Sequence, residues 1–592
     1  MSNGRALDPI TFEVIQNGLA SLVDEMALTV MRTAYSGVVK DAMDYSTAFC
    51  DADGEVIAQG LTIVLHLGSF PDAVAAIRKK FAGRINEGDV FILNDPYTSG
   101  GIHLPDIYVF KPVFATEQAG GRGPVKSLVG FAGCVAHHTD VGGLVPGSNS
   151  TESVEIFQEG LRIPALKLFD GGKPVEAVFD FLATNVRLPE KVLGDLRSQI
   201  ASVATGERGF LQLVARYGAG ELRRYTNELL DYTERRARAE IGDMPDGTWE
   251  FTDYIDADNI PDGPIAIKVR LTIAGDIIEV DFEGTTKQVP AGINSPLPFS
   301  KAGVYGAVRL VMDPAIPTSS GFNRAIRVKM PAGTVVNPVP PAACGARGIT
   351  GFRVMDAVLG ALAQAVPARV SADGDGGNSL ITIGGYDDNG AGFAFVDFMA
   401  GARGGRPGGD GPEGVPHPGA NIANIPVEIA EVEAPVRIEH YGIVPDTGGP
   451  GKHRGACAQV RRVRLMSGEA TLQLRSDKRF HPPWGLQGGL AGTPSQNTLL
   501  SGSGDRDLRT MCQVPMKRGE VILHLLAGGG GWGDPLERDP QLVREDVRNE
   551  KLTVAYVLNH YGVAVDPKTF EIDEAQTRAV RAALRRARPE RH

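Results

Sequence analysis

Two short segments of the chain combine imidazole and carboxylate side chains in a pattern that suits a catalytic metal ion. The first runs from His103 to Asp106, and the second is the His-His-Thr-Asp run at 137–140. Histidine nitrogen together with carboxylate oxygen is a donor set for Zn, Mn or Fe. A proline inside the first segment prevents a regular helix, so a tight turn there would aim both polar side chains at one point. The spacing matches no standard metal signature, so ordinary loop chemistry is the alternative.

Other polar residues are weaker candidates. Asp41 and Asp44 precede an extended stretch, and either could supply a further oxygen ligand or cap a turn. His66 follows an apolar strand, a position typical of a satisfied core histidine. The segment Asn94–Tyr97 could hold a substrate, although Asn-Asp-Pro is also ordinary turn chemistry.

Glycine runs invite a nucleotide-binding interpretation that the sequence does not support. The run Gly528–Gly531 lacks the Lys-Ser/Thr of a P-loop. Tight packing under Trp532 is the better interpretation, and Gly448–Gly451 is interpreted in the same way. The sequence contains neither a GxSxG elbow nor an obvious catalytic cysteine. The chain by itself therefore shows no site for ATP.

The elements that must position these residues alternate between helical and extended patterns. Helical spacing and start signals at Asp8 and near Ser69 predict helices over 8–36, 69–80, 188–242, 300–312 and 351–366. Apolar runs bounded by turn residues predict strands at 90–93, 107–114 and 128–135, with a hairpin pair at 265–273 and 277–282. The stretch 115–126 is expected to be an exposed loop. Both candidate segments lie where strands begin or end, which is where mixed proteins place their chemistry.

The expected fold is therefore mixed α and β, with several domains, because 592 residues exceed what one core supports. Changes of pattern divide the chain into an N-terminal α/β metal-site domain, a β-rich domain, a mixed, mainly β domain and a helical tail, at 1–243, 244–345, 346–535 and 536–592. The third contains a Gly/Pro-rich loop, 401–419, which is expected to be either a flexible insertion or a loop near a partner.

Composition limits the classes of function. A net charge of −11 argues against nucleic acid or an anionic membrane as the main partner. Five cysteines, none close in sequence, favour a reducing compartment, and no apolar run approaches the length of a membrane span. We therefore expect a soluble cytoplasmic protein. The arginine-rich end, 575–592, predicts an amphipathic helix that docks on the acidic body or on a partner, with a frayed tail as the alternative.

Together these motifs resemble the hydantoinase B/oxoprolinase family. The resemblance is carried by Asn94–Tyr97, Gly100–Asp106, the run 137–143 and Pro146–Ser148, and it continues at 63–68, 446–455, 482–489 and 528–535. It covers about residues 8–565. The family includes subunits of N-methylhydantoinase, caprolactamase-type enzymes, acetone carboxylase and acetophenone carboxylase, and fused 5-oxoprolinases. The stretch 115–126 departs from the family by being longer than expected between the two motifs.

The resemblance implies a machine of two components. A separate A-type subunit would bind ATP with Mg and phosphorylate the carbonyl or enol oxygen of a small-molecule substrate. This chain, the B-type subunit of a hetero-oligomer, would hold a divalent metal, with Zn, Mn and Fe all open. Carried over residue by residue, its ligands would be Asp44, His103, Asp106 and His137. His137 is preferred to His138 because relatives often place tryptophan after the matched histidine.

The function favoured by this resemblance is ATP-dependent opening of a cyclic amide such as a hydantoin, a lactam or 5-oxoproline. Phosphorylation would make the amide carbon electrophilic, and a metal ion makes water acidic enough to attack near neutral pH. In this scheme His138 or Asp140 would orient a metal ligand, and Asp95 would be a general base. The alternatives are carboxylation of a ketone through a phosphoenol, and a non-catalytic structural subunit whose histidines merely pack.

Overall fold

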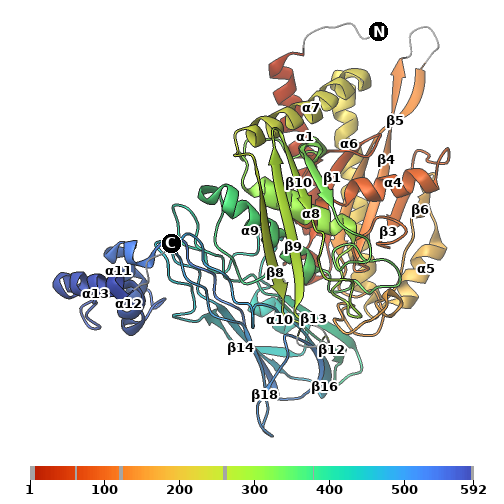
Figure 1. Ribbon diagram of the computed structural model, residues 1–592. Coiled ribbons are helices and arrows are strands. Elements are labelled where there is room, and N and C mark those ends of the chain that lie inside the picture. Colours follow the sequence, from red (N-terminus) through yellow and green to blue (C-terminus); the bar gives the residue numbers. More distant parts are fainter. Residues whose placement is uncertain are drawn as a thin grey trace.

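A computed structural model describes residues 7–587 apart from 61–62, 119–123, 258–259, 261–262 and 378. Its body contains a seven-stranded sheet near the N-terminus, a four-stranded sheet in the middle of the chain and two further sheets in the C-terminal half (Figure 1). Among the helices of this described part, none combines the length and the apolar composition needed to cross a membrane.

The N-terminal sheet carries the segments singled out in the sequence. Its strands are β1 (Tyr45–Asp51), β2 (Val56–Gln59), β3 (Val90–Leu93), β4 (Asp106–Gln118), β5 (Pro124–His137), β6 (Leu166–Asp170) and β7 (Lys173–Pro174). Their order is β2-β1-β5-β4-β3-β6-β7, and every neighbouring pair is antiparallel. This topology places the start of β1, the start of β4 and the end of β5 side by side, at the same end of three neighbouring strands.

Helices cover both faces of this sheet. One face carries α1 (Pro9–Thr33), α6 (Pro189–Tyr217) and α7 (Ala219–Gly242), and the other carries α3 (Val64–Leu67) and α4 (Phe70–Lys80). Because successive strand residues point to opposite faces, Val109 joins the first apolar core and Tyr108 joins the second. The predicted start of α1 is confirmed, since the Asp8 side chain accepts a hydrogen bond from the N–H of Thr11.

The second sheet contains β8 (Gly247–Ile255), β9 (Ile265–Ala274), β10 (Ile277–Asp281) and β11 (Ile326–Lys329), in the order β11-β10-β9-β8. Strands β9 and β10 form the predicted hairpin. Helices α8 (Leu297–Leu310) and α9 (Gly348–Ala365) pack against this sheet and against each other. Nearly all of α9 is buried, and α8 also contacts α3. These two helices therefore connect the middle of the chain to the N-terminal sheet.

Two sheets of the C-terminal half share one apolar core. The first contains β12 (Leu380–Tyr386), β13 (Gly392–Phe398), β16 (Glu469–Arg475) and β19 (Met511–Lys517). The second contains β14 (Val436–Ile443), β15 (Gln459–Leu465), β17 (Gln496–Leu500), β18 (Arg506–Asp507) and β20 (Val521–Leu525). Leu472 of the first sheet and Val463 of the second belong to the same core cluster. The remaining short elements are α2 (Gly37–Lys40), α5 (Glu176–Asn185), α10 (Val427–Glu433) and the 3-10 turns η1 (Ile156–Gln158), η2 (Ser320–Ala325), η3 (Pro367–Arg369) and η4 (Pro535–Glu537).

A bundle of extended, glycine-rich segments lies beside these sheets, and we call it the glycine array. Its central segment, 527–533, is surrounded by the segments 403–405, 447–456 and 484–492. A Cβ on Gly528, Gly529, Gly530 or Gly531 would lie between 1.9 and 2.1 Å from a carbonyl oxygen, each time of a different residue. Backbone hydrogen bonds leave the central segment in several directions, which no flat sheet allows. Only glycine permits packing this close.

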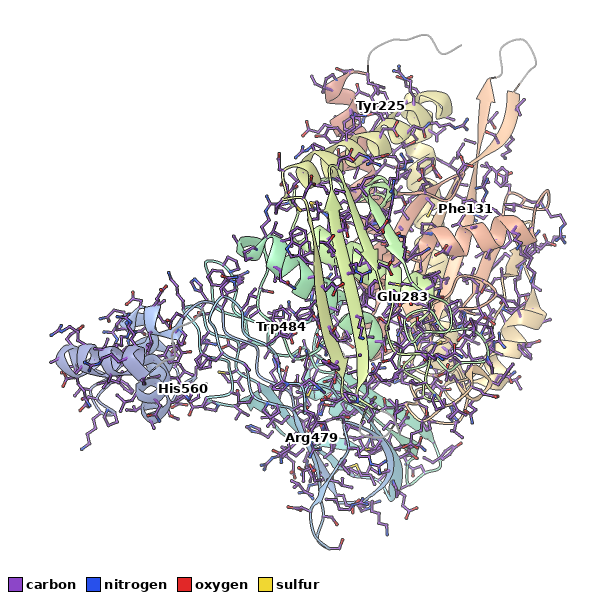
Figure 2. The ribbon with its side chains drawn as sticks, viewed as in Figure 1. Phe131, Tyr225, Glu283, Arg479, Trp484 and His560 are labelled. Atoms are coloured by element: carbon purple, nitrogen blue, oxygen red, sulfur yellow. The ribbon has the colours of Figure 1, made fainter. Side chains whose placement is uncertain are left out.

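The glycine array contacts the second sheet and leads into the helical tail. Figure 2 labels Trp484 beside the second sheet, where its ring lies 5.7 Å from that of Phe251. Beyond the array, α11 (Pro540–Arg548), α12 (Val554–Tyr561) and α13 (Glu574–Ala587) form a separate lobe that projects from the body (Figure 1). Val543, Val557 and Tyr561 form part of its own small core.

One expectation about a loop is wrong, and so is one of the two alternatives given for another. The stretch 115–126 is not an exposed loop at its flanks, because β4 continues to Gln118 and β5 starts at Pro124, and residues 119–123 lie outside the described residues. The segment 401–419 is not a flexible insertion, because Ala402 and His417 are buried and part of the segment belongs to the glycine array. In the first stretch, pairing between β4 and β5 extends both strands in spite of the polar composition. In the second, packing of the backbone in the glycine array orders the segment in spite of its glycines and prolines.

Candidate metal centre

Three neighbouring strands of the N-terminal sheet bring polar side chains together at one end of the strands. Strand β4 begins at Asp106 and β5 ends at His137, and these two residues are direct partners in the ladder. Strand β1 begins one residue after Asp44, whose carbonyl oxygen accepts a hydrogen bond from the N–H of His137 at 2.9 Å. Antiparallel pairing therefore gathers residues from three separate parts of the sequence.

Two more histidines approach from adjacent turns. His103 lies in the tight turn before β4, where a Cβ on Gly101 would lie 2.0 Å from a neighbouring carbonyl oxygen. Its Nε2 atom lies 3.0 Å from Oδ2 of Asp106. His66 lies in α3, and its Nε2 atom lies 3.6 Å from the same oxygen and 3.8 Å from Oδ1 of Asp44. The close backbone approach at Gly101 is what allows the turn to aim His103 at the carboxylates.

The donor atoms form two overlapping groups. His103, Asp106 and His137 each offer one atom within 4.8 Å of the others, and so do Asp44, His66 and Asp106. All five side chains are buried. The arrangement therefore brings together the four residues named from the family resemblance and adds His66 to them.

Hydrogen bonds at the outer nitrogens orient two of the imidazoles. His103 Nδ1 lies 3.0 Å from the carbonyl oxygen of Gly345, which can only accept, so Nδ1 carries the proton and Nε2 is bare. His66 Nδ1 lies 3.1 Å from the hydroxyl oxygen of Ser46, whose own proton is directed to the carbonyl of Ile63. The bare Nε2 atoms of both rings thus face the carboxylates, as in metal sites whose histidines donate their other N–H to a protein acceptor.

Burial sets the protonation states of the cluster. It lowers the pKa of His66 and of His103 to about 4, so both rings are neutral at physiological pH. Burial, together with the charge of Asp106, raises the pKa of Asp44 to about 8. Burial would also raise the pKa of Asp106, but Arg347 and the two histidines hold it well below its usual value. Neutral imidazoles beside a carboxylate are the forms that bind a divalent cation.

Several polar atoms of the cluster have no hydrogen-bond partner in the described part of the chain. They are Oδ1 of Asp44, Oδ1 of Asp106 and Nδ1 of His137, all buried. Burying such atoms unpaired costs about 1–3 kcal/mol each, and a bound cation would remove that cost for acceptor atoms. The donor set of nitrogen and carboxylate oxygen also suits Zn, Mn or Fe. The residues present therefore fit a divalent metal.

A small cavity of about 30 Å³ opens on the cluster. Asp44, His66 and His137 form its polar wall, and Phe299, Phe352 and Phe398 form its apolar wall. Two arginines, Arg347 and Arg475, complete the lining. These residues come from the N-terminal sheet, from α8 and α9, and from the ends of β13 and β16. The site is therefore assembled from distant parts of the sequence rather than from one domain.

Three residues expected in catalytic roles lie outside this cavity lining. Asp95 accepts hydrogen bonds from the N–H groups of Tyr97 and Thr98 and forms an ion pair with Arg162. Both of its oxygens are thus engaged in fixing the turn after β3.

Asp140 and His138 are engaged in a similar way. Asp140 accepts hydrogen bonds from the N–H groups of Gly142 and Gly147 and pairs with Arg187 at 2.8 Å. The Nε2 atom of His138 lies 3.0 Å from Oε1 of Gln199 in α6. From these positions, both side chains can hold the backbone around the cluster in place.

Sequence reasoning misses three polar residues of the site. His66 is expected to be a core histidine, because a single histidine after an apolar stretch carries no ligand signal. Arg347 and Arg475 lie in segments with no local motif, and only the tertiary fold brings them to the cavity. The one available signal is that 63–68 belongs to the stretches carrying the family resemblance.

A family model and two relatives match nearly the whole chain. A model of the hydantoinase B/oxoprolinase family matches residues 8–535. A protein of Pseudomonas sp. (strain NS671) described as the B component of a D-/L-hydantoinase is 31% identical over 98% of this chain and 98% of its own length. The beta component of caprolactamase from Pseudomonas jessenii is 33% identical over 98% of this chain and 99% of its own length.

Solved structures support the same fold. The ATP-dependent caprolactamase from Pseudomonas jessenii aligns with a TM-score of 0.88 at 31% identity, covering 98% of this chain and 100% of that chain. A nucleotide-free structure of acetone carboxylase aligns with a TM-score of 0.89 over 98% of this chain and 83% of that chain. At 20% identity, the second comparison shows a common fold and nothing more.

Proposed function

This chain belongs to the hydantoinase B/oxoprolinase family, and from that premise we propose that it is the metal-holding subunit of an ATP-dependent complex that hydrolyses a cyclic amide. The observation that carries the proposal is the buried cluster of Asp44, His66, His103, Asp106 and His137. The two relatives at 31% and 33% identity support the substrate class, because hydantoins and caprolactam are both cyclic amides.

The residues of the cluster would hold the metal, and each has a defined part. Asp44 and Asp106 supply carboxylate oxygens, and His66, His103 and His137 supply neutral imidazoles. When bound, a divalent ion supplies Lewis acidity at this point of the cavity. Phe299 and Phe398 exclude bulk water from the cavity, which strengthens every electrostatic interaction inside it.

The substrate would arrive already activated by the partner. The run 528–531 supplies no phosphate loop, because its glycines pack against neighbouring backbone in the glycine array. We therefore assign ATP binding to an A-type partner subunit, which would transfer phosphate to the amide oxygen. This assignment is consistent with the similarity to a caprolactamase that is itself ATP-dependent.

Asp95, His138 and Asp140 are assigned positioning roles in this proposal. Each makes hydrogen bonds or ion pairs that support the structure close to a proposed metal ligand. Asp140 anchors the segment that follows His137, so its loss would displace that ring. We assign Asp95 a positioning role in place of that of general base, because both of its oxygens are already engaged.

The experiment is reconstitution with the partner. The chain, co-purified with its A-type subunit, is assayed with ATP against a hydantoin, caprolactam, 5-oxoproline, and acetone or acetophenone with bicarbonate. We expect ring opening that needs ATP and both subunits and that His103→Ala abolishes. Ring opening by this chain alone, or wild-type turnover by His103→Ala, would contradict the proposal. Carboxylation of a ketone in place of ring opening would favour the carboxylase alternative.

A further inference from the structure

Two buried arginines line the same cavity as the proposed metal ligands. Arg347 caps the start of α9 and Arg475 ends β16, and their exposed fractions are 6% and 3%. The guanidinium of Arg347 lies 4.3 Å above the ring centroid of Phe299, and that of Arg475 lies 5.9 Å from the centroid of Phe398. Aromatic rings support both groups in place of water.

Positive charge would exceed negative charge around the cavity once a divalent ion is bound. Arg347 and Arg475 line the cavity, and Arg347 pairs with Asp106. The carboxylates of Asp44 and Asp106 carry at most two negative charges, which the two guanidinium groups already match. A bound divalent ion would engage both aspartates and add two positive charges. Buried charges are stable only when they are balanced, so the site with its metal favours an anionic ligand.

The hydrogen-bonding capacity of Arg347 is also incompletely used. Its Nη2 atom donates to Asp106, while its Nε atom is buried with no hydrogen-bond partner among the residues described. A guanidinium presents a planar fork of donors that matches the oxygens of phosphate or carboxylate. An oxyanion in the cavity would satisfy this fork and supply the missing negative charge.

The size of the cavity indicates which part of a ligand it receives. A volume of about 30 Å³ corresponds to two or three water molecules. That space suits a small tetrahedral oxyanion and not a whole cyclic amide. The ring of the ligand would therefore lie toward the phenylalanine side chains.

We propose that Arg347 and Arg475 form an oxyanion-binding subsite that recognises a phosphoryl group on the ligand. The inference rests on the proposed function, because it makes the phosphorylated substrate, and not the neutral cyclic amide, the species that this chain binds. It assigns the recognition of the activated substrate to two residues of this chain. A dianionic phosphoryl group matches the excess of positive charge better than a carboxylate does.

The test is isothermal titration of the full-length chain, with its metal content measured, against inorganic phosphate and, separately, bicarbonate. We expect saturable phosphate binding at one site and weaker binding of bicarbonate. Arg475→Gln should weaken phosphate binding by about tenfold or more, since a charge-assisted forked contact is lost. Arg462→Gln, an exposed arginine on β15, should leave it unchanged. If the variants and the wild type contain equal amounts of metal, a change in phosphate affinity is due to the arginine and not to loss of the metal.

Several outcomes overturn the inference: absent phosphate binding, tighter binding of bicarbonate, or unchanged phosphate affinity in Arg475→Gln. Should that variant melt far below the wild type, Arg475→Lys decides, because it keeps the charge and removes the fork. A loss of several fold in the Lys variant supports the subsite, and an unchanged affinity refutes it. Phosphate binding needs neither ATP nor partner, so a chain that binds phosphate but opens no cyclic amide would refute the proposed function alone.

Discussion

Metal uptake by this chain should depend on pH through Asp44. Burial and the charge of Asp106 raise the pKa of Asp44 from its usual 3.8 to about 8, so below pH 8 its carboxyl holds a proton that a metal ion must displace. The apparent affinity should therefore rise about tenfold per pH unit up to pH 8 and flatten above it. Between pH 6 and pH 8 this amounts to about 50-fold, or about 2.3 kcal/mol, because half of the Asp44 carboxyls are still protonated at pH 8. His66 and His103, with pKa values of about 4, add no slope in this window.

The assay is Mn²⁺ binding to the purified chain at pH 6, 7, 8 and 9. Asp44→Asn keeps a carbonyl oxygen but has no proton to lose, so it should bind more weakly at pH 8 and show almost no slope below it. Asp41→Asn, a neighbouring and partly exposed carboxyl outside the donor groups, should keep the wild-type slope. A flat wild-type profile, or an unchanged slope in Asp44→Asn, would refute the reasoning.

Three further outcomes are expected. His66→Ala should lower metal affinity by about tenfold or more, while His138→Ala keeps it, and elemental analysis that finds equal loss in both would remove the distinction. Gly530→Ala should lower the free energy of unfolding in urea by about 3 kcal/mol or more, because its Cβ would overlap a carbonyl oxygen. Gly220→Ala, in a helix with open space around the residue, should leave that free energy unchanged or raise it slightly. Similar unfolding curves for the two variants would contradict the packing argument. Deleting 575–592 should reduce co-purification with the A-type partner more than it lowers the melting temperature of the chain, and undiminished co-purification would exclude a role in assembly.

Local pattern is sufficient for most elements around the site. The capped start at Asp8, the apolar run of β3 and the hairpin of β9 and β10 all depend on residues close in sequence, where propensity and alternation decide the outcome. The ends of β4 and β5 are less accessible to sequence reasoning, because pairing between the two strands extends both beyond their apolar centres.

The candidate site is predictable only in part for the same physical reason. His103 and Asp106 share a turn with an unusual composition, so they attract notice without a structure. Arg347 and Arg475 belong to a buried helix and a strand end, where nothing nearby in sequence indicates a cavity. The cavity exists only after α9, β13 and β16 dock against the N-terminal sheet. Convergence of this kind leaves no periodic signal in the sequence.

The glycine array has a consequence for the order of folding. Its central segment, 527–533, is synthesised after every segment that surrounds it, and its hydrogen-bond partners lie as far back as Asp373. A nascent chain that ends before 527 therefore exposes a channel lined by unpaired backbone groups, and contacts between such distant segments form slowly. The helical lobe beyond residue 539 can take its final position only when the array has closed. We expect the hydrogen bonds between that lobe and the array or its flanking residues, such as that from the N–H of Asp446 to the carbonyl of Lys551, to acquire protection from exchange last during refolding.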